Sequence, residues 1–307
     1  MTRFNISFVK YYRYALILTF VVILAGVVSL STNGLNLGID FTGGTILHLR
    51  LEEGFQMDEI REVLAPFDLS GALLQRAGHG DQSGGNEIII KTPHLDEPTR
   101  QEIINSFMEK WSDMTAEDVL RVDNVGAIIG KELTREAFLA LLIAAIGMIV
   151  YITLRFEFKF SLAAILALMH DAFVIVAVFS IFRVEVNSPF IAAVLTIIGY
   201  SINATIIIFD RIRENLKYRR QRTVEEVVND SINETLTRTI GTSVTTLFVL
   251  ISLLIAFNYF VGGMDLKAFA IALLIGVVSG TYSSIFIAGP LWLSLRKMGM
   301  KEEKAPA

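Results

Sequence analysis

The chain of 307 residues is 53% hydrophobic and only 19% charged, whereas a soluble protein usually carries about 25% charged residues. It has no cysteine, which excludes a disulfide framework, thiolate metal sites and cysteine nucleophiles. The net charge of −4 combines two unlike parts, because residues 32–134 hold 8 Lys and Arg against 18 Asp and Glu, and the remainder is +6. The composition therefore predicts a membrane protein with one acidic polar domain.

Six apolar stretches are long enough to cross a bilayer, which takes about 20 helical residues. The first, 14–30, follows three basic residues, and no small-residue cleavage site comes after it, so we interpret it as a retained anchor rather than a signal peptide. The others are predicted at 137–154, 160–182, 189–209, 236–257 and 268–293. The chain is thus expected to comprise an N-terminus with its first helix (1–31), a polar domain (32–134), a five-helix bundle (135–295) and a tail (296–307).

The polar domain shows its own alternation of strand and helix signals. Strands are predicted at 45–51, 69–76, 87–92 and 119–125, helices at 56–66 and 96–113, and a turn at 78–85. The order βαββαβ is that of a ferredoxin-like α+β fold. His48, His79 and His94 lie far apart, so we interpret them as solvated or turn residues rather than metal ligands. We expect no cofactor, and no nucleophile–base spacing favours an enzyme.

Lys and Arg near the ends of the predicted spans indicate the orientation. With the N-terminus in the cytoplasm, the inner segments hold 16 of the 27 basic residues, and the two short outer loops hold only Arg183 and Lys267. Both termini are then expected inside and residues 32–134 outside. Long domains cross largely regardless of charge, so the negative charge of this domain does not contradict that orientation.

Ionisable residues within spans are costly and indicate function by default. Asp171 follows His170 near the middle of the third span, and Arg238 lies in the first turn of the fifth. A polar stripe on one helical face is expected to contact protein or water rather than lipid. Its members in the fifth span are Arg238, Thr242, Thr245 and Thr246.

A structural interpretation competes with the functional one. Ser, Thr and Asn in membrane helices often only bond a neighbour or their own backbone. Gly276 and Gly280 in the last span are predicted to permit close helix packing. If Arg238 and Asp171 form an ion pair, desolvation offsets much of the Coulomb gain, so two such charges favour transport over a purely structural role.

Five motifs follow one another along the chain. They are residues 37–45 (with Asp40, Gly43 and Gly44), 125–133 (with Gly126 and Gly130), His170-Asp171, 199–203 together with 209–215 (with Asn203, Asp210, Arg211, Arg213, Glu214 and Asn215), and 238–243 (with Arg238 and Thr242). Through these motifs the sequence resembles the SecF family of bacterial protein-export membrane proteins. The resemblance covers nearly the whole chain.

The resemblance implies a membrane subunit of the RND transporter superfamily, located in the bacterial inner membrane. Such a subunit pairs with SecD and uses the proton gradient, or sodium in some relatives, to promote late preprotein translocation and release on the outer face. The implied partners are SecD, the SecYEG translocon with YajC and YidC, and the unfolded preprotein. The acidic outer domain makes nucleic acid an improbable ligand.

One position departs from the family pattern. Where the family has an Asp that takes up protons, this chain has Ala204, which cannot titrate. Arg238 resembles the family arginine that ordinarily lies near that acid. Three explanations stay open: an engineered substitution, a natural variant in which Asp171 or a SecD acid carries the proton, or a subunit that acts as an uncoupled scaffold.

We hypothesise a relay of Arg238, Asp171 and a SecD carboxylate, with Asn203 and Thr242 beside it. The Asp40–Gly44 segment would act as a hinge, because paired glycines absorb backbone change cheaply, and the second span would transmit the movement through Gly126 and Gly130. The alternatives are an RND-type small-molecule or lipid exporter subunit, which predicts an internal repeat, and a non-transporting membrane scaffold or chaperone.

Overall fold

The computed structural model describes residues 5–52, 54–77, 86–218, 221–259 and 264–302. The chain divides into two compact units, of which one contains the long apolar helices and the other consists mainly of Leu37–Phe138. Six helices are long and apolar enough to cross a membrane, as the sequence predicts. We call the two parts the membrane unit and the α+β unit.

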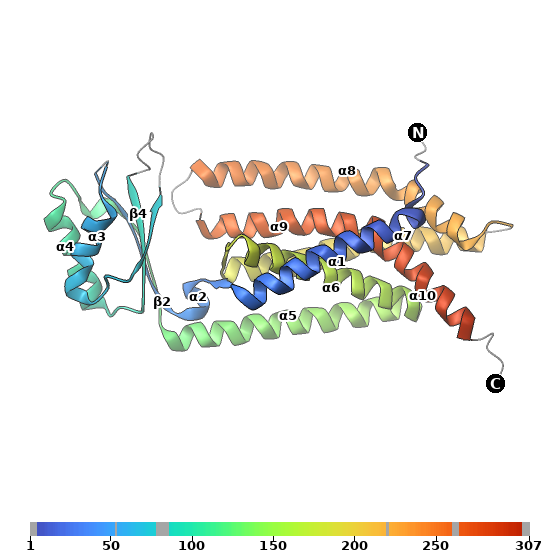
Figure 1. Cartoon of the computed structure of the whole chain (residues 1–307), viewed down its shortest axis with the longest axis horizontal. Helices are drawn as coiled ribbons and strands as arrows, with labels where there is room; N and C mark the ends of the chain where they lie inside the picture. The colour runs from blue at the N-terminus through green and yellow to red at the C-terminus, as the bar shows by residue number, and fades with distance from the viewer. Residues whose placement is uncertain (1–4, 53, 78–85, 219–220, 260–263, 303–307) are drawn as a thin grey trace. The chain divides into compact units, whose positions relative to one another are not determined.

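Several of the six helices are longer than the apolar stretches within them (Figure 1). Helix α5 begins directly after the last strand of the α+β unit. Helix α8 begins well before the predicted span 236–257, so Arg238 does not lie in the first turn of α8. The sixth is interrupted by a π-helical segment, η3. The bounds are α1 Phe8–Thr32, α5 Ala127–Arg155, α6 Phe158–Ile181, α7 Ser188–Lys217, α8 Val224–Tyr259, α9 Met264–Tyr282, η3 Ser283–Ala288 and α10 Gly289–Glu302.

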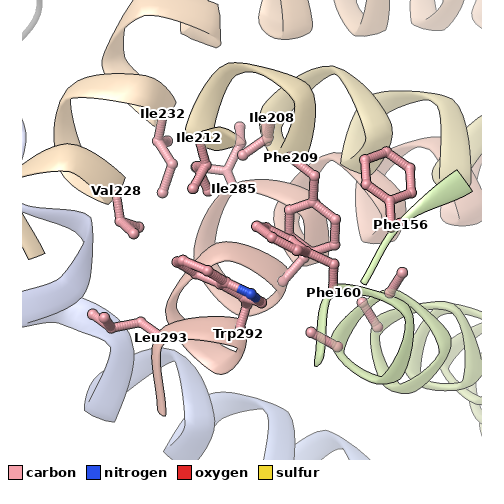
Figure 2. Close-up of a cluster of buried hydrophobic side chains, with 14 of the residues drawn as sticks. Phe156, Phe160, Ile208, Phe209, Ile212, Val228, Ile232, Ile285, Trp292 and Leu293 are labelled. Carbon is pink, nitrogen blue, oxygen red and sulfur yellow. The ribbon is translucent and has the colours of Figure 1, made fainter. Parts of the chain in front are cut away.

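An aromatic core joins the start of α6, the end of α7 and α10. Trp292 of α10 stacks on Phe160 of α6, with ring centroids 4.4 Å apart. Phe209 of α7 meets the same Phe160 ring edge-on at 5.0 Å. Figure 2 shows these rings pointing toward one another, with aliphatic side chains of α7, α8 and η3 beside them. Such a core buries large side chains and fixes the relative positions of these helices.

Helix α1 packs closely along α6. A Cβ added to Gly26 of α1 would lie 2.4 Å from the Cβ of Ala177, so only glycine permits this approach. Ser29 and Ser180 share a buried hydrogen bond of 2.8 Å nearby. Small residues and hydroxyl pairs of this kind are the usual means by which membrane helices associate.

The α+β unit is a four-stranded sheet with two main helices. The strand order is β3-β4-β2-β5, and all neighbours are antiparallel. This βαββαβ order confirms the predicted ferredoxin-like arrangement, whereas the predicted turn at 78–85 lies outside the described residues. The elements are β2 Gly44–Arg50, α3 Met57–Leu64, β3 Leu73–Ala77, β4 Glu87–Thr92, α4 Glu97–Lys110 and β5 Val119–Val125, with the short segments α2 Ile39–Thr42, η1 Ala65–Phe67 and η2 Ala116–Asp118. The two-residue strands β1 Asn36–Leu37 and β6 Glu185–Val186 form a separate two-stranded sheet.

Alternation along β2 separates two environments. Leu47 and Leu49 are fully buried in the core that the sheet forms with α3 and α4. His48 lies between them in the sequence and on the opposite face. The prediction of a solvated or turn histidine is wrong at this position, because His48 is buried and its Nε2 lies 2.9 Å from Oε2 of Glu87. The alternation of β2 places His48 on this second face of the sheet, where the Glu87 carboxylate of β4 meets it.

Candidate functional site

A carboxylate lies buried in the middle of the membrane unit. Asp171 of α6 has no exposed surface, although its helix is mostly apolar. An isolated carboxylate in an apolar environment is very costly unless hydrogen bonds satisfy it. Its partners therefore decide what the residue can do.

Three serine hydroxyls donate to Asp171. The Oγ atoms of Ser201 and Ser283 lie 2.5 and 2.7 Å from Oδ2, and the Oγ of Ser279 lies 2.7 Å from Oδ1. His170 Nδ1 lies 3.0 Å from Oδ1. All three serines are buried. We call these five residues the Asp171 cluster.

Two glycines bring the serines within reach. A Cβ at Gly276 of α9 would lie 2.4 Å from the side chain of Ile197 of α7, and a Cβ at Gly280 would lie 3.0 Å from the Cβ of Ser201. Helices α9 and α7 thus touch where larger residues would separate them, which confirms the predicted packing role of both glycines. Ser279 and Ser283 lie four residues apart and so share one helical face.

The π-helical segment η3 begins at Ser283, directly at the cluster. π-Helical turns within α-helices are often found at functional sites. The next residue, Ser284, shares a buried hydrogen bond of 2.9 Å with Thr205 of α7. Residues of η3 therefore bond α6 through Asp171 and α7 through Thr205.

His170 extends the cluster toward α1. Its Nε2 lies 3.4 Å from the Oγ1 of Thr19, and the same Thr19 oxygen lies 3.4 Å from the hydroxyl of Tyr282. That tyrosine donates to the backbone oxygen of Ala15 at 2.8 Å. A series of polar groups thus leads from the Asp171 carboxylate to helix α1.

Arg238 is not part of this cluster. It is exposed on α8, and its guanidinium makes no hydrogen bond or ion pair with any residue described in the structure. Its backbone oxygen accepts from the Thr242 hydroxyl at 3.1 Å. The hypothesis of a direct Arg238–Asp171 pair is therefore wrong for this chain alone, since the cluster satisfies Asp171.

Two further members of the predicted stripe on α8 are also uncovered, whereas Thr246 is half-buried and its hydroxyl donates to the carbonyl oxygen of Thr242. Thr242 and Thr245 are exposed, and their hydroxyls donate to carbonyls of their own helix. Ser243, which sequence reasoning did not single out, is instead a buried polar contact of α8. It accepts from Tyr200 at 3.2 Å and shares a bond of 2.6 Å with Thr281.

Positions 203 and 204 flank the buried side of α7. Asn203 is exposed and Ala204 is half-buried, whereas Ser201 and Thr205 face the protein interior. The described residues therefore give Asn203 no contact with Asp171. Position 204 lies three residues after the serine that holds Asp171 but is less buried than that serine.

The charged motif that closes α7 forms a network with α8. Arg211 donates to Glu234 at 2.5 Å and to Glu214 at 2.7 Å, and Asn215 donates to Glu234 at 2.9 Å. Asp210 accepts from Arg155 of α5 at 3.2 Å. Arg213, the remaining member, is exposed. The motif therefore ties the end of α7 to α8 and α5.

The glycine motifs meet within the α+β unit. Gly43 and Gly44 have φ of 73° and 145°, a region that favours glycine, and a Cβ on Gly44 would lie 2.7 Å from the carbonyl oxygen of Thr92. A Cβ on Gly130 of α5 would lie 2.9 Å from the nitrogen of Gly43. We call Gly43, Gly44 and Gly130 the glycine junction.

The other two members of these motifs lie less tightly packed. Asp40 is half-buried in the first turn of the short helix α2. Gly126 has open space where a Cβ would be. Close packing therefore requires glycine at the junction but not at position 126.

The serines around Asp171 were missed by sequence reasoning. The only local signal is the four-residue spacing of Ser279 and Ser283 in an apolar span. Ser201 comes from a different helix, so its contact with Asp171 depends on how α7 packs against α6 and η3.

Comparison with known proteins bears on the whole chain. Residues 106–298 match the family described as protein export membrane protein SecD/SecF, C-terminal, and residues 28–54 match the SecD/SecF GG motif. The chain is 39% identical over 285 residues to the protein translocase subunit SecF of Sebaldella termitidis, covering 92% of this chain and 90% of that one. It is 39% identical over 300 residues to the subunit of the same name from Acidaminococcus fermentans, covering 97% and 99%.

A solved structure shares the fold. The crystal structure of SecDF, a translocon-associated membrane protein from Thermus thermophilus, aligns with a TM-score of 0.83 and 36% identity, over 96% of this chain. The chain spans only 39% of that longer protein. A second crystal structure, of SecDF in a super-membrane-facing form, aligns with a TM-score of 0.69 over 99% of this chain.

Proposed function

Because the chain belongs to the SecF subunits of the SecD/SecF family, we propose that it acts with SecD to drive late preprotein translocation and release with the energy of an ion gradient. It is a multi-pass membrane protein of the Sec export machinery, and so a transport protein rather than an enzyme. Homology to SecDF suggests pairing with SecD. The gradient, its ion and the mechanism belong to the proposal.

The buried Asp171 carboxylate is the observation that supports coupling to a gradient. Among the described residues it is the only buried acid of the membrane unit, and Ala204 cannot carry a proton. We therefore favour the explanation in which Asp171, together with an acid of SecD, takes the role that the family gives to position 204.

Proton binding would change the hydrogen bonds of the Asp171 cluster. The ionised carboxylate accepts from Ser201, Ser279 and Ser283, and a proton on one oxygen turns part of this acceptor into a donor. At least one serine must then bond elsewhere. Ser283 has such an alternative, because its Oγ also lies 3.3 Å from the carbonyl oxygen of Gly280. The rearrangement would loosen η3 from α6.

Arg238 would form the contact between the relay and SecD. An exposed guanidinium on an apolar helix is costly in lipid, so this face of α8 favours contact with another protein. A SecD carboxylate opposite Arg238 would satisfy the charge, and Asn203 and Thr242 are exposed and free to join that contact. The relay then runs from Asp171 through SecD to Arg238.

The outer domain would receive the movement through α5. This helix continues from the glycine junction into the membrane, so a shift of α5 would act on Gly43, Gly44 and the segment from Asp40. With both termini in the cytoplasm, the acidic α+β unit would face outward and present a hydrophilic surface to an unfolded chain. SecYEG, YajC and YidC are the further partners in this proposal.

The test uses the chain reconstituted with SecD and the translocon in vesicles. Asp171→Asn should abolish the dependence of preprotein release on the gradient and leave the gradient-independent release intact. Asp210→Asn, which alters a half-buried carboxylate of α7 that pairs with Arg155 outside the Asp171 cluster, is the matched control. Ala204→Asp should raise gradient-dependent release, because it supplies a titratable carboxylate at the position where the family has its proton-binding acid.

Two outcomes would contradict the proposal. Equal gradient dependence in the Asp171→Asn variant would remove Asp171 from the relay. Unchanged export after Arg238→Met would favour the alternative of a non-transporting scaffold. Thermal unfolding of each variant separates a lost function from a lost fold.

A further inference from the structure

A cavity of about 790 Å3 lies at the end of the membrane unit where α6 begins and α7 and α10 approach their C-terminal ends. Its volume falls in the range of roughly 300–1,000 Å3 that is usual for sites of small organic ligands. None of its residues belongs to the Asp171 cluster. Its lining therefore calls for a separate explanation.

Four basic side chains from three helices converge on the cavity. Lys159 comes from α6, Arg213 and Lys217 from α7, and Arg296 from α10. One carboxylate, Glu157, lines it as well, so the lining carries a net charge of +3. Within the described ranges none of the four cations forms an ion pair. The cavity is therefore strongly electropositive.

Basic residues elsewhere at the ends of these helices do have acidic partners. Arg155 pairs with Asp210, Arg211 with two glutamates, and Lys297 with Glu225. Lys10, Arg13 and Arg238 also have no ion pair among the described residues, but they do not line this cavity. Four unneutralised cations around one cavity favour an anionic ligand there.

The start of α6 adds to the positive potential. Residues 157–160 line the cavity, and no side chain caps this helix N-terminus. The first N–H groups of a helix and its macrodipole favour a nearby anion, and phosphate in particular. This effect acts together with the four side chains rather than in place of them.

The floor of the cavity is aromatic. Trp292 and Phe160 belong to its lining, and their rings are buried and stacked on each other (Figure 2), with the guanidinium of Arg296 5.4 Å from the Trp292 ring centroid. Phe158 beside them is 74% exposed at the start of an apolar helix. A ligand that combines an anionic group with apolar chains fits both parts of this lining.

We propose that the cavity binds the phosphate headgroup of an anionic phospholipid, with an acyl chain lying against the exposed Phe158, beside the buried Trp292. Basic pockets between membrane helices are suited to such headgroups. Inorganic phosphate offers the same anion but nothing for the aromatic floor. An acidic protein segment would match the charge, but it would not account for an exposed phenylalanine beside it.

The test follows quenching of Trp292 by phospholipids brominated on their acyl chains. Because the chain has two tryptophans, Trp111→Phe in the α+β unit leaves Trp292 as the sole reporter in the full-length protein. Brominated phosphatidylglycerol should quench it at a lower mole fraction than brominated phosphatidylcholine. Each cation removed should weaken this preference about fivefold, and Arg213→Gln with Lys217→Gln about 25-fold.

The controls separate charge, fold and ligand source. Lys10→Gln with Arg222→Gln, which removes two basic residues that do not line the cavity, should leave the preference unchanged. The charge-conserving pair Arg213→Lys and Lys217→Arg should retain most of it. Equal quenching by both lipids, or an equal loss in the charge-conserving pair, would overturn the proposal. Displacement of the brominated lipid by inorganic phosphate alone would assign the site to free phosphate and refute the lipid.

Discussion

The six apolar helices of the membrane unit fall into two groups that differ in how much this chain covers them. In the most apolar stretches of α6 and α7, 44% of the residues are buried, against 6% in α5 and 11% in α8. The helices are similar in length and hydropathy. Hydropathy therefore identifies a membrane helix but does not indicate whether its neighbours are protein or lipid.

The difference lies in small and polar residues at the contacts. Helix α6 buries Ala163, Ala164 and Ala167, and α9 approaches α7 through Gly276 and Gly280. These residues let helices come close enough for buried hydrogen bonds to form. Helices α5 and α8 expose large side chains instead, among them Phe138, Ile143, Phe248 and Val249. The outer faces of α5 and α8 are therefore suited to contact with lipid or with a partner protein. Homology to SecDF favours SecD as that partner.

The largest expected effect comes from the aromatic core. Trp292→Ala should lower the free energy of unfolding by about 3–5 kcal/mol, because it removes a fully buried ring and leaves a cavity. Phe248→Ala on α8, where the ring is 67% exposed, should change it by less than about 0.5 kcal/mol. Reversible denaturation in detergent followed by circular dichroism measures both. Equal losses would mean that α8 is packed as tightly as α10.

Glycine substitutions should differ in sign between the two groups. Gly276→Ala forces a methyl group against Ile197 and should cost about 1–3 kcal/mol of unfolding free energy. Gly241→Ala on α8 meets no atom within 4 Å and should stabilise the helix by up to about 1 kcal/mol. The same denaturation measurement gives both changes in the free energy of unfolding. A lower free energy of unfolding for Gly241→Ala would contradict the uncovered surface of α8.

Serine substitutions should show the value of the Asp171 cluster. Ser279→Ala removes one donor to a buried carboxylate and should cost about 1.5–3 kcal/mol. Ser252 on α8 donates only to the carbonyl of Phe248 in its own helix, so Ser252→Ala should cost less than half as much. If both variants unfold at the same denaturant concentration as the unmodified chain, Asp171 does not depend on its serines.

The smallest effect is expected for Arg238→Leu in the chain alone. The guanidinium has no partner among the described residues, so the free energy of unfolding should change by less than about 0.5 kcal/mol. Co-purification with SecD should nevertheless weaken, because the proposed SecD carboxylate loses its partner. A strong destabilisation without SecD would show that Arg238 has a contact within this chain.

Much of the fold was predictable because its signals are local. The six apolar helices and the βαββαβ order follow from runs and alternations of apolar residues, and the structure confirms both. The helix ends were not predictable in the same way. An apolar run marks the part of α8 suited to lipid, but the polar residues from Val224 onward continue the same helix. The environment of His48 was missed because it depends on Glu87 in another strand.

The candidate site, like the fold, has features that local sequence predicts and features that depend on tertiary contacts. The sequence by itself determined that Asp171 and Arg238 are costly charges within apolar helices, because that cost depends only on the residue and its neighbours along the chain. Only the tertiary structure decided their partners. Asp171 is satisfied by Ser201, Ser279 and Ser283, whereas Arg238 faces away from this cluster. The physical reason is that a hydrogen bond forms at about 3 Å, and helix packing, here through two glycines, determines which distant side chains come that close.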